Sequence, residues 1–598
     1  MLTFKPSAGS PNKLWRTLHQ FLLTAQTRSN RPEYRLWLSL SLLIVAIYGA
    51  LSIIHVFSQP YIIQDDARQH IFWTQRYIDP DLFPGDLIAN YFESMAPAGF
   101  RAFYHSVASL GFDPVVVGKV LPIILGCVAT FYCFQISLQL IPLPAVAFLT
   151  CLIFNQGLWM EDDLVSATPR AFLYPIFMAF LNYLLRRNWP AVLVTIVLNG
   201  LFYPQMVLSS MAIITFRLFD WPGKAFKFSQ LTAKIKTNFK PWLACMVTGI
   251  TILLIYRAGA TEFDPTITVE QAKALPEFNL VNGEFGRAYF FTENPWLFWL
   301  IWPRSGLLFI GVFPPLFFAG LGLPFVRRQV KRFPLIQRVN AKKLDILTHI
   351  FWASIALFFL SHAVLFKLHL PNRYVYYTFR FILTFASSIT IAAMLESGLR
   401  SLMHKLPFGL TGRDCLKLGF NLVLAILLVG LPFSQKILLP LQNYQVGEES
   451  EVYEFLQQQP KDALVASLSE AADNIPTFSK RSTLVAYEYA LPYHWGYAEP
   501  FRQRSMDLIQ AQYSPDIAQV QNFIQRYGVD FWLVDQTAFQ PEYVETLSLV
   551  QQMGASVEIA EQLRQDASPA LLETIQACSA LENSRIVLLD AECILGRD

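Results

Sequence analysis

The sequence predicts a polytopic α-helical membrane protein that ends in a separate α/β domain. Of its 598 residues, 54% are hydrophobic and only 15% are charged. Soluble domains are about 25% charged, so this composition excludes an ordinary soluble protein. The long apolar segments stop near residue 440, after which the composition changes. The formal net charge of +3 gives no indication of nucleic-acid binding.

The first apolar segment covers residues 36–57, which contain no Asp, Glu, Lys or Arg. At ~1.5 Å per residue its length matches a bilayer core of about 30 Å. It is too long for a signal peptide and lacks a clear cleavage site. We therefore interpret the basic and polar residues 1–35 as a cytoplasmic N-terminal segment that precedes a retained transmembrane helix.

Further crossings are predicted from the remaining apolar segments. They cover residues 115–139, 143–160, 170–185, a pair of short helices within 190–219 that turns near Tyr203 and Pro204, 241–257, 297–325 with a break near Pro303, 346–368, 379–396 and 418–438. With about eleven crossings, the strongly basic loops fall on one side of the membrane, and such loops are typical of the cytoplasmic side. We expect a transmembrane domain over residues 36–440 in the cell membrane, with external loops 58–113 and 258–296.

Residues 441–598 have the composition of a soluble domain, and the count of crossings places them outside. A helical pattern at 516–527 precedes a short apolar run at 529–534, and the same order returns at 571–579 and 586–589. Helices that alternate with short apolar strands predict an extracytoplasmic α/β domain. In that compartment Cys578 and Cys593 are able to form a disulfide.

Two adjacent acids, Asp65 and Asp66, follow the first helix directly. Pro60 ends that helix, and the mixture of apolar and polar residues from Ile71 to Tyr77 predicts a second helix that lies on the membrane surface. Acids at a helix start commonly serve as caps. Two acids where one cap suffices favour a functional role.

Counting crossings places further charged side chains on the same side as the acid pair. They are His70, Glu161, Asp162, Asp163, Arg170, Arg373 and Arg380. A carboxylate acts as general base on an acceptor hydroxyl, and guanidinium groups pair with phosphate oxygens, so the set predicts transfer from a lipid phosphate. Arginines at helix ends are also common membrane anchors. The tyrosines of RYVYYTF (373–379) are expected in an interfacial aromatic belt.

Taken together, these features resemble the GT-C class of integral-membrane glycosyltransferases, which includes protein O-mannosyltransferases, lipid A aminoarabinose transferases and oligosaccharyltransferase catalytic subunits. The resemblance lies in Gln64, Asp65 and Asp66 of a long first external loop, the amphipathic helix after them, about eleven crossings and an external C-terminal domain. It implies a polyprenyl-phosphate sugar donor, an acceptor that is a glycan, lipid or protein, and a catalytic role for Asp65 or Asp66. The chain lacks the WWDYG signature of oligosaccharyltransferases, which disfavours direct N-glycosylation.

Three alternatives stay open at the level of sequence. A divalent cation is a candidate cofactor, because Asp66 and His70 are four residues apart and 161–163 offer further oxygen ligands. The plainer interpretation makes His70 an interfacial polar residue and 161–163 a solvated helix end. A transporter or flippase for a lipid-linked or small solute would use helices broken at 199–205 and near Pro303, although no repeat of two halves is visible. The third alternative is an inactive scaffold of the same fold.

Overall fold

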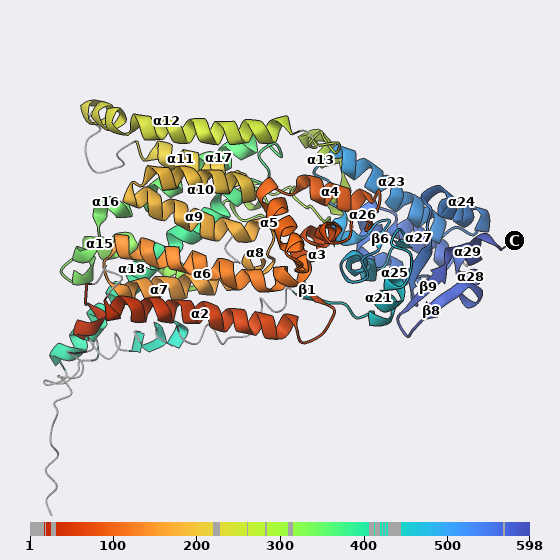
Figure 1. The fold of residues 1–598 in the computed structure, drawn as a ribbon, viewed down its shortest axis with the longest axis horizontal. Helices are drawn as coiled ribbons and strands as arrows, with labels where there is room; N and C mark the ends of the chain where they lie inside the picture. Colours follow the sequence, from red (N-terminus) through yellow and green to blue (C-terminus); the bar gives the residue numbers. More distant parts are fainter. Residues whose placement is uncertain are drawn as a thin grey trace, which may run out of the picture.

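The computed structural model describes residues 17, 19–25, 31–218, 228–259, 261–281, 284–308, 315–405, 412, 419–420, 422–424, 426–428, 444–565 and 568–597. A helical bundle and a C-terminal part lie end to end, and the long helices run along the long axis of the molecule (Figure 1). Most of the predicted N-terminal segment 1–35 and most of the predicted helix 418–438 lie outside the described residues.

The bundle is built from apolar helices of 12 to 33 residues. They are α2 (Pro32–Val56), α6 (Pro114–Leu140), α7 (Pro144–Trp159), α9 (Pro169–Arg186), α10 (Trp189–Phe202), α11 (Gln205–Phe216), α12 (Phe228–Ala258), α17 (Ile346–Ala363) and α18 (Arg373–Lys405). By length and composition, 5 helical stretches in the described chain can cross a membrane. The break between α10 and α11 at Tyr203 confirms the predicted pair of short helices. The total of eleven crossings stays a prediction.

Local sequence explains where several of these helices begin. Asp113 caps α6 by accepting a hydrogen bond from the backbone N–H of Val115 at 2.8 Å. Pro144 and Pro169 lie in the first turn of α7 and α9. Proline is suited to that position because the first N–H groups of a helix have no partner within the helix.

The segment 297–325 is not a single helix over its described part. It holds the end of α14 (Pro295–Leu300), the 3-10 helix η4 (Pro315–Gly322) and the start of α15 (Leu323–Arg328). Pro303 follows α14 and Pro324 lies in the first turn of α15. Proline removes a helical N–H donor and clashes with the preceding turn, so high hydropathy alone does not produce one continuous helix here.

The first loop folds against the C-terminal part. It contains α3 (Asp65–His70), the 3-10 helix η1 (Phe72–Tyr77), α4 (Leu87–Met95) and α5 (Ala98–Ser109). Phe72 and Trp73 are 1% and 0% exposed, and the ring of Phe72 packs edge-on against Tyr489 at 5.6 Å. The prediction of a helix lying on the membrane surface is therefore wrong, because the apolar side chains of this segment pack against protein.

Residues 444–597 hold a five-stranded sheet covered by helices (Figure 1). The strands in spatial order are β6 (Ser482–Thr483), β5 (Leu464–Ser467), β7 (Phe531–Asp535), β9 (Ile586–Asp590) and β8 (Ser579–Glu582). Strand β5 pairs in parallel with β6 and β7, whereas β9 is antiparallel to β7 and β8. The first four residues of β7 are all buried, as is typical of a strand covered on both faces.

Several helices accompany this sheet. They are α21 (Ser450–Gln457), α22 (Ile475–Phe478), α23 (Trp495–Gln512), α24 (Ile517–Tyr527), α25 (Pro541–Thr546), α26 (Ser548–Met553), α27 (Ser556–Arg564), α28 (Ala570–Cys578) and α29 (Ala591–Leu595). Cys578 and Cys593 form a disulfide that joins α28 to α29. A two-stranded antiparallel pair of β1 (Ile62–Gln64) and β4 (Tyr444–Val446) ties the start of the first loop to the C-terminal part. The first loop is thereby held from the far end of the sequence.

Candidate active site

Neither Asp65 nor Asp66 is the N-cap of the helix that follows the first strand of the loop. Helix α3 begins at Asp65, and its cap is the side chain of Gln64, which accepts a hydrogen bond from the N–H of Ala67 at 3.0 Å. The carboxylates of Asp65 and Asp66 therefore have other partners. Asp65 accepts a hydrogen bond from Arg68 at 2.8 Å and keeps 38% of its side chain exposed.

Asp66 is joined to the second loop through Arg170. The guanidinium of Arg170, in the first turn of α9, forms a short ion pair with Asp66. The same group lies 3.3 Å from Asp163 and 4.0 Å from Asp162. Asp162 is 39% exposed and Asp163 is 1% exposed. Acids that are about 100 residues apart in the sequence thus share one cation.

Arg380 extends this chain of charges into the bundle. Its guanidinium lies 3.5 Å from Asp163 and donates to the hydroxyl groups of Tyr174 and Tyr376, each at 2.5 Å. Arg380 is 0% exposed, and Tyr174 also donates a hydrogen bond to Asp163. We call Asp65, Asp66, Asp162, Asp163, Arg170 and Arg380 the acid–arginine cluster.

The tyrosines of RYVYYTF do not form an aromatic belt. Helix α18 begins at Arg373, so these residues belong to the helix, and Tyr374, Tyr376 and Tyr377 are buried. Tyr376 and Tyr377 contact Arg380 and Arg373 respectively. The prediction is wrong because neighbouring helices cover this end of α18 and leave the hydroxyl groups to hold guanidinium groups.

Arg373 is the arginine of the predicted site that forms no ion pair with a carboxylate among the described residues. It donates to the hydroxyl of Tyr377 at 3.0 Å, and its guanidinium carbon lies 5.7 Å from the ring centroid of that tyrosine. The Nε atom of Arg373 is buried without a hydrogen-bond partner. Arg373 differs in this charge pairing from Arg170 and Arg380, which both form ion pairs with acids.

His70 forms no hydrogen bond or ion pair with the acid–arginine cluster in the described chain. Its ring packs edge-on against Phe92 at 5.3 Å. Burial, together with the guanidinium of Arg287, lowers the pKa of His70 to about 4, so the imidazole is neutral at pH 7. The predicted association of His70 with Asp66 in a shared site has no contact to support it within the described chain.

The carboxylates of the cluster hold an arginine in this structure, and a divalent cation stays a prediction. Asp66, Asp162 and Asp163 converge on the guanidinium of Arg170, which takes the position that a shared metal ion would need. Over the residues that the structure describes, no group of three or more His, Cys, Asp or Glu side chains is arranged to hold a metal ion.

A second network, which sequence reasoning missed, fixes the first loop from the C-terminal part. Glu488, within the 3-10 helix η8 (Tyr487–Tyr489), accepts hydrogen bonds from Gln69 at 2.6 Å, Arg68 at 3.2 Å and Arg287 at 2.5 Å. Asp473 lies 3.8 Å from Arg68. Burial raises the pKa of Asp473 to about 7, although Arg68 beside it acts in the opposite direction.

These network residues give only a weak signal in the sequence. Glu488 is a single acid between two tyrosines, and its partners are about 420 and 200 residues away. The pairing is set by how the C-terminal part docks onto α3. The pattern of apolar and polar residues within a single segment does not predict that docking.

Glu161 provides a pH-dependent test of the site. Burial raises its pKa to about 8; Arg380 opposes this rise, and Asp163 and Asp162 add to it. A glutamate in the unfolded chain has a pKa of 4.5, so the folded protein binds an extra proton between pH 4.5 and 8 and loses stability as the pH rises through that window. We expect Glu161→Gln to flatten the fall of the thermal unfolding midpoint between pH 5.5 and 8.5.

Glu558→Gln is the matched control, because Glu558 is exposed on α27 and the substitution removes the same charge. Its pH profile should follow that of the wild type. An unchanged slope in Glu161→Gln, measured by scanning fluorimetry in one detergent, would contradict the proposed protonation of Glu161.

No protein-family model and no curated protein matches this sequence. Among solved structures, the chain is similar to the oligosaccharyltransferase AglB of Archaeoglobus fulgidus in complex with an inhibitory peptide and a dolichol-phosphate, with a TM-score of 0.48 and 11% identity over 87% of this chain and 72% of that one. It is also similar to the same enzyme in a complex with Zn and sulfate, with a TM-score of 0.44, 12% identity and coverage of 87% and 70%. The chain is also similar to the arabinofuranosyltransferase AftD from mycobacteria, with a TM-score of 0.43 and 14% identity over 86% of this chain and 36% of that one.

These neighbours are GT-C glycosyltransferases, the class that the sequence resembles. At such identities the likeness concerns the fold alone.

Proposed function

We propose that this chain is a membrane glycosyltransferase that moves a sugar from a polyprenyl-phosphate donor to a hydroxyl group of a glycan, lipid or protein. The observation that carries the proposal is the acid–arginine cluster, in which acids of two loops meet at one end of the membrane helices. Asp65 and Asp162 stay more than a third exposed there, so carboxylate oxygens remain accessible to a substrate.

In this proposal Asp65 is the general base. Its carboxylate accepts the proton of the acceptor hydroxyl while that oxygen attacks the anomeric carbon of the sugar. The bond from the anomeric carbon to the phosphate oxygen breaks, and the polyprenyl phosphate leaves with the bonding electrons. Arg373 donates hydrogen bonds to the phosphate and stabilises the negative charge that develops on it.

The remaining charged residues position these groups. Arg170 holds Asp66 against the second loop, and Arg380 holds Asp163 from within the bundle. Glu488 fixes Arg68, which in turn holds Asp65. The C-terminal part therefore has a direct link to the proposed base, which a transporter or flippase would not require.

We also propose that the cluster faces the extracytoplasmic side and that the N-terminus is cytoplasmic. The basic run 327–343 and the end of α9 at Arg186 lie at the end of the bundle that is remote from the C-terminal part (Figure 1). Basic segments beside membrane spans favour the cytoplasmic side. This orientation supports placing the donor at the outer face of the cell membrane.

The proposal is tested with the purified full chain and a panel of radiolabelled polyprenyl-phosphate sugars. We expect release of polyprenyl phosphate together with transfer of the label to an acceptor from a membrane extract. Movement of an intact labelled lipid across proteoliposomes, without cleavage of the sugar–phosphate bond, would overturn the proposal in favour of a flippase.

Arg373→Gln is expected to raise the KM for the donor roughly 10- to 100-fold, because a hydrogen bond to a charged group contributes about 1.5–3 kcal/mol. Arg373→Lys keeps the charge but loses the planar pair of donors, so its KM for the donor should lie between those of the wild type and Arg373→Gln. The KM of each protein is measured from initial rates as a function of donor concentration. An unchanged KM in Arg373→Gln would remove Arg373 from the phosphate site.

A further inference from the structure

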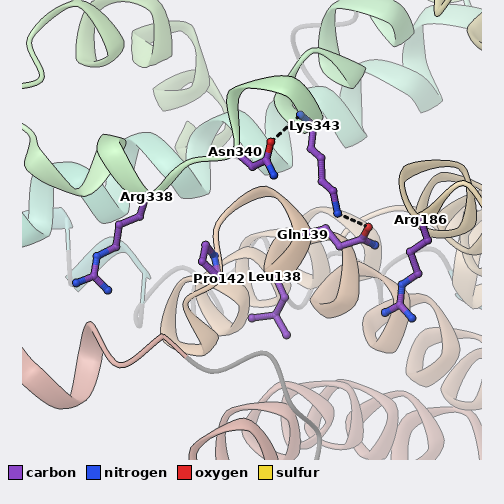
Figure 2. A pocket seen from close by; sticks show the side chains of 7 residues that line it. All are labelled: Leu138, Gln139, Pro142, Arg186, Arg338, Asn340 and Lys343. Atoms are coloured by element: carbon purple, nitrogen blue, oxygen red, sulfur yellow. Dashed lines mark hydrogen bonds between the residues drawn. The ribbon is translucent and has the colours of Figure 1, made fainter.

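A cavity of about 570 Å3 lies at the end of the bundle that is remote from the acid–arginine cluster. It is lined by Leu138, Gln139, Pro142, Arg186, Arg338, Asn340 and Lys343 (Figure 2). These residues come from the end of α6 and the turn after it, the end of α9, the 3-10 helix η5 (Pro334–Arg338) and α16 (Ala341–Leu344) with the residue before it. Three of the lining side chains are cationic and none is acidic.

The three cations are bound only by neutral acceptors in the part of the chain that the structure describes. Arg186 donates to the side-chain oxygen of Gln135 at 2.7 Å, and Lys343 donates to that of Gln139 at 3.0 Å. Arg338 donates to the backbone carbonyl of Leu23 at 2.6 Å. Within the described residues none of the three forms an ion pair, so their charges are not cancelled.

The two glutamines are themselves held in place. Gln135 and Gln139 lie one turn apart on α6, where side chains four residues apart share a face. The amide of Gln139 donates to the side-chain oxygen of Asn182 at 2.9 Å, and that of Gln135 donates to the hydroxyl of Tyr34. Their oxygens are thereby turned toward Lys343 and Arg186. The cations are oriented in advance without losing charge.

Figure 2 shows Arg338 and Arg186 on opposite sides of Lys343. The side chain of Arg338 extends away from the other two, whereas Arg186 and Lys343 bring a guanidinium and an ammonium to the same side of the cavity. Such groups match the oxygens of a phosphate group. Leu138 and Pro142 add an apolar wall, and candidate membrane spans border the cavity on α6 and at 341–363. Basic pockets between membrane helices are known to hold phosphorylated headgroups.

We propose that this cavity is a second anion site, separate from the donor site, and that it binds the phosphate group of an anionic lipid headgroup or a free phosphate ion. Both sources share the same chemistry at Arg186, Arg338 and Lys343. The proposal does not depend on the sugar-transfer reaction, since the two sites lie at opposite ends of the bundle.

The test compares two double variants with the same change of charge. Arg186→Gln with Lys343→Gln alters the cavity, whereas Arg187→Gln with Lys342→Gln alters the exposed neighbours, which do not line it. For the lipid source, the full chain is placed in nanodiscs of phosphatidylcholine with a minor fraction of phosphatidylglycerol, and retained lipid is counted by native mass spectrometry. For the ion source, inorganic phosphate is titrated against chloride at equal ionic strength while the thermal midpoint is followed.

We expect the cavity variant to bind one of the two probes at least ~10-fold more weakly than the wild type, the effect of losing one charge-assisted hydrogen bond, while the control variant binds like the wild type. Selective loss of phosphatidylglycerol identifies a lipid site, and selective loss of the phosphate-induced shift identifies an ion site. Equal loss in both double variants would show unspecific attraction to surface charge and overturn the proposal. So would wild-type binding in the cavity variant. Should that variant fail to fold, Arg338→Gln, which gives up only a hydrogen bond to a backbone carbonyl, is subject to the same comparison.

Discussion

Asp65→Asn is expected to lower the rate of sugar transfer by ~10²–10⁴-fold, the usual contribution of a general base. The amide is nearly isosteric with the carboxylate but cannot accept the proton of the acceptor hydroxyl. Asp65 is 38% exposed, and asparagine can still accept the hydrogen bond from Arg68, so the thermal midpoint should change little. The measurement is the transfer rate at saturating donor, with the midpoint determined on the same preparation.

Asp81→Asn is the matched control for this experiment. Asp81 lies in the same loop, is 80% exposed and contacts Lys461 rather than the acid–arginine cluster. Its loss should leave the rate unchanged. Asp66→Asn separates the two acids of the pair, because Asp66 holds Arg170 and its loss should lower the midpoint as well as the rate. If Asp65→Asn retains the wild-type rate while Asp66→Asn is inactive, the role of base passes to Asp66.

The placement of the acids at one end of the bundle could be predicted from the sequence because the lengths of apolar segments determine which ends of the helices meet. Asp66 and Asp163 are separated by two long helices, α6 and α7, which return the chain to the same end. That reasoning gives an end of the bundle but no distances. The shared contact with Arg170 also depends on where α9 begins, and Pro169 marks that position in the sequence.

The side chains that the sequence could not reveal are those whose role depends on docking. Gln64 caps α3, and β1 is held by β4, which lies about 380 residues away. Glu488 reaches Gln69 in the same way. The sequence around Tyr376, an aromatic residue near an arginine at a helix start, is compatible with two environments. One is an aromatic belt at the membrane surface, and the other is a buried position with a hydrogen bond. Only the packing of neighbouring helices decides between the two.

Arg380→Met is expected to destabilise the folded protein by up to about 3 kcal/mol, the lower end of the usual cost of removing one partner of a buried ion pair. Asp163 would keep its hydrogen bond from Tyr174 and its ion pair with Arg170 at 3.3 Å but lose the cation at 3.5 Å, and both side chains of the pair are 1% exposed in the wild type. Arg327→Met, at an exposed position on α15, is the control for loss of one charge. Combining Arg380→Met with Asp163→Asn removes both charges of this pair, and the loss in the double variant should be smaller than the sum of the two single losses, because the two side chains contact each other. Thermal midpoints are measured in one detergent for the wild type, Arg380→Met, Asp163→Asn, the double variant and Arg327→Met. Arg380 and Asp163 are not coupled if Arg380→Met is as stable as Arg327→Met, or if the loss of stability in the double variant equals the sum of the two single losses. Arg380 would then not position the acids of the cluster.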